Sequence, residues 1–133
     1  MDQWLDWRNN VFLPPYGEVF RPPIFGTKLF RDENVHNEMY AEARKKLNAA
    51  LDHLEAHLAK GHPYLAGSDV TIADLALVLL VLMLSVVIDE EDLLSSRRHL
   101  ASWYHDIPKV VPHWNEVNSA FYAWKASRKE TKQ

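Results

Sequence analysis

Residues 67–88 read GSDVTIADLALVLLVLMLSVVI, and this stretch decides the fold class. Thr71 and Asp74 stand three residues apart where its apolar run begins, which is the spacing of a helix capping box. In that motif the threonine hydroxyl accepts a hydrogen bond from a first-turn N–H, and the carboxylate accepts one from the N–H of Thr71. We therefore predict a helix that begins at this cap and ends near Ile88.

This helix is expected to be the buried centre of a domain rather than a membrane span. Between Leu75 and Ile88 only Ser85 is polar, so the helix is apolar on every side. The run rises about 21 Å, which is short of the roughly 30 Å of hydrocarbon in a bilayer. Acidic residues limit it at both ends, namely Asp74 and the segment 89–92, for which we predict a solvated loop. The first residues, DQWLDWRNN, do not form a signal peptide pattern.

The composition indicates one all-helical domain. The chain has 133 residues, only four glycines and few alternating β-branched segments. It has no cysteine, which excludes thiol catalysis, disulfides and cysteine-bound metal and fits a cytoplasmic protein. The net charge of −3 and the pI near 6.1 argue against nucleic acid as the main ligand.

The residues before the central helix predict two helices and one irregular segment. A first helix is expected over residues 2–13, because Pro14 and Pro15 interrupt the pattern there. Residues 16–37 show no periodicity and are expected to form an irregular strap. Residues 38–60 carry an apolar stripe of helical spacing and predict an amphipathic helix.

Two further helices are predicted after the acidic segment. Their apolar positions repeat at helical spacing, as Leu100, Trp103, Tyr104 and Ile107 in the first and as Val117, Ala120, Phe121 and Trp124 in the second. Pro108 is expected to end or bend the first of them. We predict a domain over residues 1–125 and a polar, basic tail or linker over 126–133.

Three segments in this order resemble a known family. YLAG at 64–67, TIADLAL at 71–77 and RRHLASWYHDIPKVVP at 97–112 are similar to the C-terminal helical domain of cytosolic glutathione transferases. The resemblance implies an all-α bundle with a buried central helix. It also implies that the glutathione site lies mostly in an N-terminal thioredoxin-like domain, which shows no pattern in this chain. We therefore expect no catalytic residue and no cofactor here, and glutathione only where a longer parent supplies that domain.

Within the family, QWLDWRNNVFLPP at 3–15 and VFRPPIFG at 19–26 are most similar to the gamma subunit of eukaryotic elongation factor 1. The same helical domain occurs in scaffold proteins of multi-tRNA-synthetase assemblies. The resemblance implies a non-catalytic assembly domain, with elongation factor subunits or synthetase-complex proteins as partners. The alternative is the helical half of a transferase that conjugates glutathione to electrophiles. Self-association into a homodimer through an exposed face is also expected.

Candidate site residues follow partly from this resemblance. Trp4, Trp7 and Val11 correspond to the helix that lines the hydrophobic-substrate pocket of transferases, or else to a face on which another domain packs. On the helix that pairs such domains in scaffold proteins, the interface candidates are Arg97, Arg98 and Asp106. The competing interpretation of the two arginines is a solvated basic turn.

The remaining polar motifs predict structure rather than chemistry. His53 and His57 have the i, i+4 spacing of a zinc pair, but two solvated histidines are favoured and no metal site is predicted. HLEAH differs from the HExxH motif, because Glu55 lies on roughly the opposite helix face. Asp74 is interpreted as a cap, whose removal would cost about 1–2 kcal/mol of stability.

Overall fold

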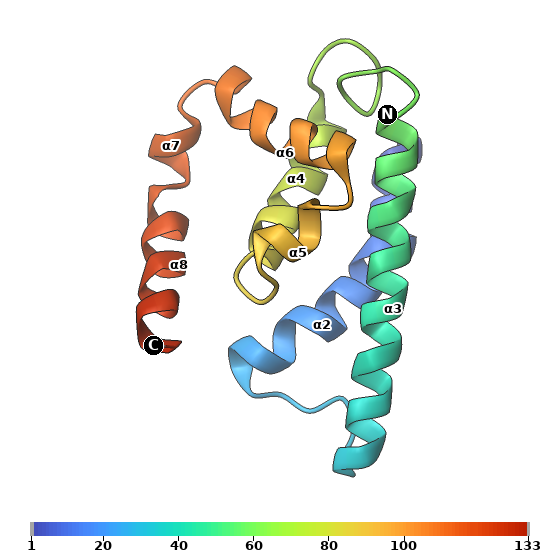
Figure 1. Cartoon of the computed structure of the whole chain (residues 1–133), viewed down its shortest axis with the longest axis vertical. Coiled ribbons are helices and arrows are strands. Elements are labelled where there is room, and N and C mark those ends of the chain that lie inside the picture. Colours follow the sequence, from blue (N-terminus) through green and yellow to red (C-terminus); the bar gives the residue numbers. More distant parts are fainter. Residues whose placement is uncertain (1, 133) are drawn as a thin grey trace.

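The structure, a computed structural model, describes the backbone of residues 2–132 and the side chains of residues 3–128. It consists of helices joined by short turns, and no strand forms within these residues (Figure 1). The elements are α1 (Asp2–Trp7), the π-helical turn η1 (Arg8–Phe12), α2 (Leu13–Phe25), α3 (Glu33–Leu58), α4 (Ile72–Leu84), α5 (Glu90–Leu94), α6 (Arg98–Val110), α7 (Trp114–Val117) and α8 (Ser119–Lys132). The predicted all-α class is confirmed.

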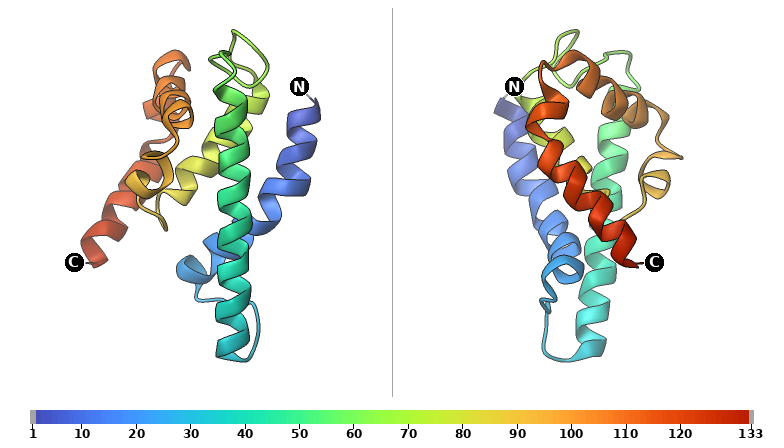
Figure 2. Two further views of the ribbon diagram at one scale, coloured as in Figure 1. Left: turned by 45° about the vertical axis from the view of Figure 1, so that its right-hand side comes forward. Right: turned by 90° about the vertical axis from the view of Figure 1, so that its left-hand side faces the viewer.

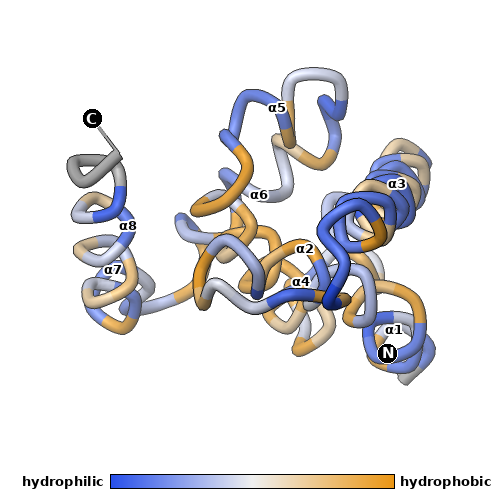
Figure 3. Tube along the Cα trace, turned by 90° about the horizontal axis from the view of Figure 1, so that it is seen from below, coloured by the Kyte–Doolittle hydropathy of each residue, from blue (hydrophilic) through white to orange (hydrophobic). Residues whose placement is uncertain are grey.

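The capped apolar helix α4 lies at the centre, as predicted. It runs between α1 and α3 on one side and α6 on the other (Figure 2), and Figure 3 shows its orange, hydrophobic trace in the middle of the molecule. Most of its side chains are buried, although Leu79 is 41% exposed. The helix ends at Leu84, earlier than predicted, and residues 85–88 form turns that still bury Ile88. No helix within the described residues is long and apolar enough to span a membrane.

The N-terminal segment corrects the prediction of a short helix followed by an irregular strap. The helix continues through the prolines, because Pro14 and Pro15 lie in the first turn of α2, where a backbone N–H has no partner within that helix. The π turn η1 precedes them, with the N–H of Leu13 bonded to the carbonyl of Arg8. Helix α2 then ends at Phe25, where Gly26 adopts a left-handed conformation with φ 68°.

Helix α3 is the longest element and begins five residues earlier than predicted. Asp32 caps it, because its Oδ1 accepts hydrogen bonds from the N–H groups of Asn34 and Val35, at 2.8 and 3.2 Å. The predicted leucine stripe is buried in the core. One face of α3 meets η1 and α2, and another meets α6.

The C-terminal part differs from the prediction in two places. The predicted solvated loop at 89–92 instead opens the short helix α5, which buries Leu93 and Leu94. The last predicted stripe is split between α7 and α8, and Val117 is 77% exposed rather than part of the core.

Helix α8 continues to Lys132, so the segment after residue 125 extends a helix, and the domain boundary placed there stays a prediction. The four apolar residues predicted for α6 are all buried, and Pro108 lies inside that helix.

Candidate functional site

A groove of about 540 Å³ separates the N-terminal helices from α3. We call it the α1–α3 groove, and it is lined by Trp7, Asn10, Val11, Pro14, Pro15, Lys46, Ala49, Ala50 and His53. The residues from α3 recur at i, i+3, i+4 and i+7, so they form one stripe on that helix. Its two alanines are small and leave room for the groove. Most of the lining is apolar, which is typical of small-molecule sites.

Aromatic stacking forms one wall of the groove. The rings of Trp7 and His53 stack with centroids 5.3 Å apart, and Trp4 meets His57 edge-on at 4.7 Å. His57 Nε2 lies 2.8 Å from the carbonyl oxygen of Leu65, which holds this ring in place. His53 is exposed, as predicted for a solvated histidine, whereas His57 is half-buried, and both rings also pack against tryptophans. No group of three metal-ligating side chains occurs among the described residues.

The predicted pocket residues divide between the groove and its support. Trp7 and Val11 line the groove, and Val11 is 46% exposed. Trp4 does not line the groove but supports Trp7, because the two rings pack edge-on with centroids 5.5 Å apart. The lining supplies only three polar side chains, namely Asn10, Lys46 and His53, which can orient a ligand but form no acid–base pair with one another.

Tyr16 is the tyrosine nearest in sequence to the groove, and it is not an activated hydroxyl. Its ring stacks on Phe20 at 5.5 Å and on Phe12 at 6.2 Å. Burial raises the pKa of Tyr16 to about 12, although the positive charge of Arg8 opposes this rise. The hydroxyl therefore stays protonated at neutral pH and would not serve as a base.

Asp74 is fully buried and does more than cap α4. With Thr71 it forms the predicted capping box, in which its Oδ2 accepts from the Thr71 N–H at 2.9 Å. The Thr71 hydroxyl also donates to this oxygen, at 3.1 Å. The other oxygen, Oδ1, accepts from the N–H of Leu65 and from the indole N–H of Trp103, both at 2.9 Å. One carboxylate thus joins the loop before α4, the start of α4 and the middle of α6.

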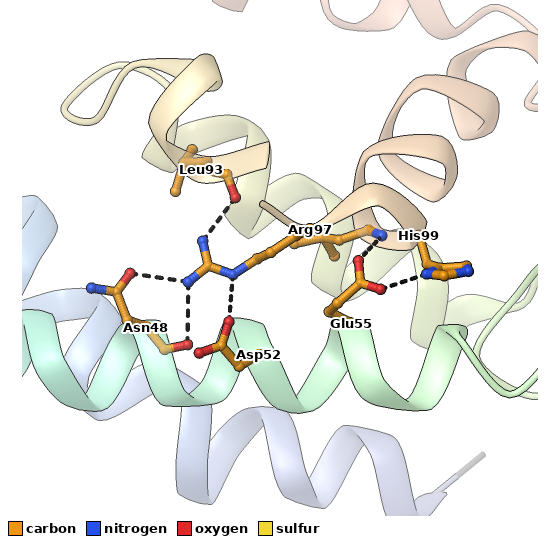
Figure 4. A network of polar contacts seen from close by, with 7 residues as sticks. Asn48, Asp52, Glu55, Leu93, Arg97 and His99 are labelled. Atoms are coloured by element: carbon orange, nitrogen blue, oxygen red, sulfur yellow. Dashed lines mark hydrogen bonds and ion pairs between the residues drawn. The ribbon is translucent and has the colours of Figure 1, made fainter. Parts of the chain in front are cut away.

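Arg97 has a structural role. This corrects its prediction as an interface residue and also the competing interpretation as part of a solvated basic turn. Its side chain is buried, so it is neither solvated nor free to contact a partner. Figure 4 shows the guanidinium between α3 and α5: Nε donates to Asp52 at 2.8 Å and Nη1 to the carbonyl of Leu93 at 2.8 Å. Nη2 lies 3.3 Å from the side-chain oxygen of Asn48.

The other two interface candidates stay predictions. Arg98 is exposed on α6, next in sequence to the buried Arg97. Asp106 is partly buried and accepts a hydrogen bond from the hydroxyl of Tyr64 at 2.8 Å. That hydrogen bond, together with burial and the nearby negative charge, raises the pKa of Tyr64. Asp106 is thus already engaged within the chain, whereas Arg98 remains accessible.

A second polar cluster was missed by sequence reasoning. Glu55 of α3 accepts from the Leu100 N–H at 2.9 Å and lies 2.6 Å from His99 Nδ1, so it caps the first turn of α6 (Figure 4). The placement of Glu55 opposite the two histidines is therefore correct, but its partner was not foreseen. A usable signal was present: Asn48, Asp52 and Glu55 repeat at helical spacing beside the leucine stripe.

These features define a helical domain in which a doubly anchored acidic cap holds the central helix. A family model described as "Glutathione S-transferase, C-terminal domain" matches residues 37–106, and the chain belongs to this family.

Two named relatives are plant glutathione transferases. The chain is 31% identical over 117 residues to glutathione S-transferase F9 of Arabidopsis thaliana, covering 88% of this chain and 53% of the relative. It is also 31% identical over 123 residues to glutathione S-transferase F10 of that plant, covering 91% and 54%.

Solved structures agree on the fold. The structure of poplar glutathione transferase F1 is similar at a TM-score of 0.71 with 26% identity, over 90% of this chain and 52% of that one. Glutathione transferase F2 from Populus trichocarpa gives a TM-score of 0.71 with 24% identity, over 92% and 55%. The chain therefore spans about half the length of the relatives that it matches.

Proposed function

We propose that this chain is the helical half of a glutathione transferase and that its α1–α3 groove receives the apolar part of the electrophile. The observation that carries the proposal is an accessible, largely apolar groove of about 540 Å³ on a chain of this family. The glutathione thiol would be bound and activated by a thioredoxin-like half, as the family resemblance implies.

In this proposal the residues of the groove bind and orient rather than react. Trp7 offers a flat face that its stacking on His53 holds in one orientation. Val11, Pro14 and the two alanines of α3 exclude water from the ligand, which favours an apolar electrophile. Lys46 is exposed and forms no ion pair with the side chains of residues 3–128, so it is free to meet a negatively charged substituent.

The assembly function suggested by the resemblance to elongation factor 1 gamma has weaker support. The relatives above are glutathione transferases by name, which favours the enzymatic function. The Pro-Pro pairs that carried the finer resemblance also lie within α2 and do not form a separate docking strap. Protein partners, a homodimer and a cytoplasmic location stay predictions.

The test is glutathione conjugation of 1-chloro-2,4-dinitrobenzene by the full-length product of the gene that encodes this chain. Val11→Trp would fill the groove, so we expect the KM for the electrophile to rise about tenfold while the KM for glutathione stays the same. Lys109→Gln, on α6, is the matched control and should change neither constant. Absence of conjugation by the unaltered product, or an equal change in both KM values, would contradict the proposal.

A further inference from the structure

The connection between α2 and α3 exposes two aromatic side chains. Phe25 is 68% exposed and Phe30 is 52% exposed, and these are the most exposed aromatic side chains among the described residues. The connection lies at the end of the molecule opposite to the loop that precedes α4 (Figures 1 and 2). We call residues 25–31 the α2–α3 tip. The rings in it are available to a partner outside the chain.

The backbone of the α2–α3 tip is held in place at both ends. Gly26 adopts a left-handed conformation, and its N–H donates to the carbonyl of Pro22 at 2.8 Å. The N–H of Leu29 donates to Nδ1 of His36, a buried side chain of α3, at 3.0 Å. The tip therefore presents its two phenylalanines from a fixed backbone, which lowers the entropic cost of binding.

The charge of this part of the chain is opposite to that of the whole. Residues 19–31 contain three basic side chains, Arg21, Lys28 and Arg31, and no acidic one, whereas the net charge of the chain is −3. Two acidic residues follow at the start of α3. Asp32 accepts from two N–H groups of that helix, so the positive helix end offsets its charge, and Glu33 is exposed. The partner of the tip is therefore expected to be anionic.

A polar cavity of about 340 Å³ lies directly behind the tip. The hydroxyl of Thr27, the ammonium of Lys28 and the amide of Asn37 line it, and all three can donate hydrogen bonds. Neither Lys28 nor Arg31 forms an ion pair with any side chain of residues 3–128. Such donors suit the oxygens of a phosphate group.

We propose that the α2–α3 tip docks on the surface of anionic phospholipid bilayers. Phe25 and Phe30 would enter the boundary between headgroups and acyl chains, while Lys28 and Arg31 would stay among the phosphates. The polar cavity would receive one headgroup. This peripheral contact differs from a membrane span. It requires neither glutathione nor the α1–α3 groove, so it goes beyond the proposed transferase function and can fail separately from it.

The experiment is co-sedimentation of the purified protein with vesicles. One set is phosphatidylcholine alone, and the other is phosphatidylcholine mixed with phosphatidylglycerol in equal amounts. We expect binding to the anionic vesicles to be at least about tenfold tighter and to weaken as salt is added. Lys28→Gln and Arg31→Gln should each weaken it about fivefold. Phe25→Ser combined with Phe30→Ser should weaken it by about tenfold or more, with unchanged helical circular dichroism.

A gain of binding provides a test that damage to the fold cannot imitate. Glu33→Gln removes a negative charge beside the tip and should strengthen binding to the anionic vesicles by up to about fivefold. The matched controls are Lys60→Gln, an exposed cation beyond the other end of α3, and Val117→Ser, an exposed apolar residue of α7. Both should leave the affinity unchanged.

Three results would overturn the proposal. Equal affinity for the two kinds of vesicle would indicate unspecific apolar binding. Equal effects of the tip variants and the controls would place the contact on another surface. Binding of a soluble decaglutamate peptide that Lys28→Gln abolishes, without binding to either vesicle, would show that the tip recognises an acidic polypeptide instead.

Discussion

At the residue scale, Asp74 shows how one buried carboxylate serves several elements. A residue that only capped α4 would interact with Thr71 alone, whereas Asp74 also holds the indole of Trp103 and the backbone of Leu65. Both of these additional donors lie in buried surroundings. The four hydrogen bonds explain why a charged group is tolerated at the edge of the apolar core.

The structure therefore predicts a larger effect of Asp74→Ala than the cap alone implies. Loss of the cap costs about 1 kcal/mol, and two buried donors left without acceptors cost about 1–3 kcal/mol each. We expect the free energy of unfolding to fall by about 3–7 kcal/mol in urea denaturation followed by circular dichroism. Asp69→Ala, an exposed aspartate five residues earlier, should change it by less than about 0.5 kcal/mol. A loss near 1 kcal/mol for Asp74→Ala would show that the additional hydrogen bonds do not contribute.

At the scale of elements, the described part of α8 packs chiefly against its neighbour α7. It follows α7 down the side opposite to α3 (Figure 1), and Phe121 is the residue of α8 that packs partly against the core. The ion pair between Lys125 and Glu90 joins it to α5. The side chain of Lys125 is only 12% exposed, so this pair lies largely out of the solvent on the lysine side.

The attachment of α8 should depend on pH. The pKa of Glu90 is lowered from its ordinary value of 4.5, because the stabilising effect of Lys125 exceeds the effect of burial. A group with a depressed pKa stabilises the fold above its ordinary pKa, and this stabilisation is lost as the pH falls through the lowered value. We expect the amide NMR signals of α8 to shift below about pH 4.5.

Two substitutions on α5 provide the comparison for this titration. Glu90→Gln should remove the transition in α8 and leave its signals near their low-pH positions throughout. Glu91→Gln is the control, because Glu91 is exposed on the same short helix. A transition that persists in Glu90→Gln would assign the pH dependence to another group.

The elements that could be predicted from the sequence are those determined by local signals. The capping box, the leucine stripe of α3 and the buried stripe of α6 depend on spacing within one helix, and the structure confirms them. The continuation of the helix through Pro14 and Pro15 could not be predicted, because it depends on the π turn before them and on packing against α3. The burial of Arg97 was missed for a similar reason, since Asn48 and Asp52 lie 49 and 45 residues away in the chain.

For the candidate site, the sequence indicated the helix but not the groove. Trp7 and Val11 were predicted, whereas Lys46, Ala49 and Ala50 come from a helix whose register against the first one is a tertiary property. The family resemblance supplied the expectation of a hydrophobic pocket. The stacking of Trp7 on His53 has no signal in either local segment, because the two rings meet only when α1 and α3 are packed together.

At the scale of the whole molecule, the α1–α3 groove is an apolar surface that the described residues leave uncovered. Another domain or a second copy of the chain can reduce its exposure to water, and both are consistent with the predicted packing face. Helix α7 offers a comparison, because Val117 is 77% exposed but does not line the groove.

The chain by itself should therefore self-associate through the groove. Val11→Lys places a charge in the apolar surface and should shift sedimentation velocity profiles at high concentration toward the monomer. Val117→Lys makes the same change at an exposed site elsewhere and should leave the profiles unaltered. A strictly monomeric unaltered chain, or an equal effect of the two substitutions, would contradict this prediction.

The π turn η1 has a consequence for how the chain tolerates changes in length. A π turn holds one residue more than the corresponding α-helical turn. In an α-helix, each residue rotates the direction of the side chains by about 100° around the helix axis. Deleting Asn9, which does not line the groove, would convert η1 into regular helix and rotate α1 by that angle relative to α2. Trp4 and Trp7 would then turn away from the two histidines of α3. A deletion of one residue at this turn would therefore remove the aromatic wall of the groove without altering any residue in it.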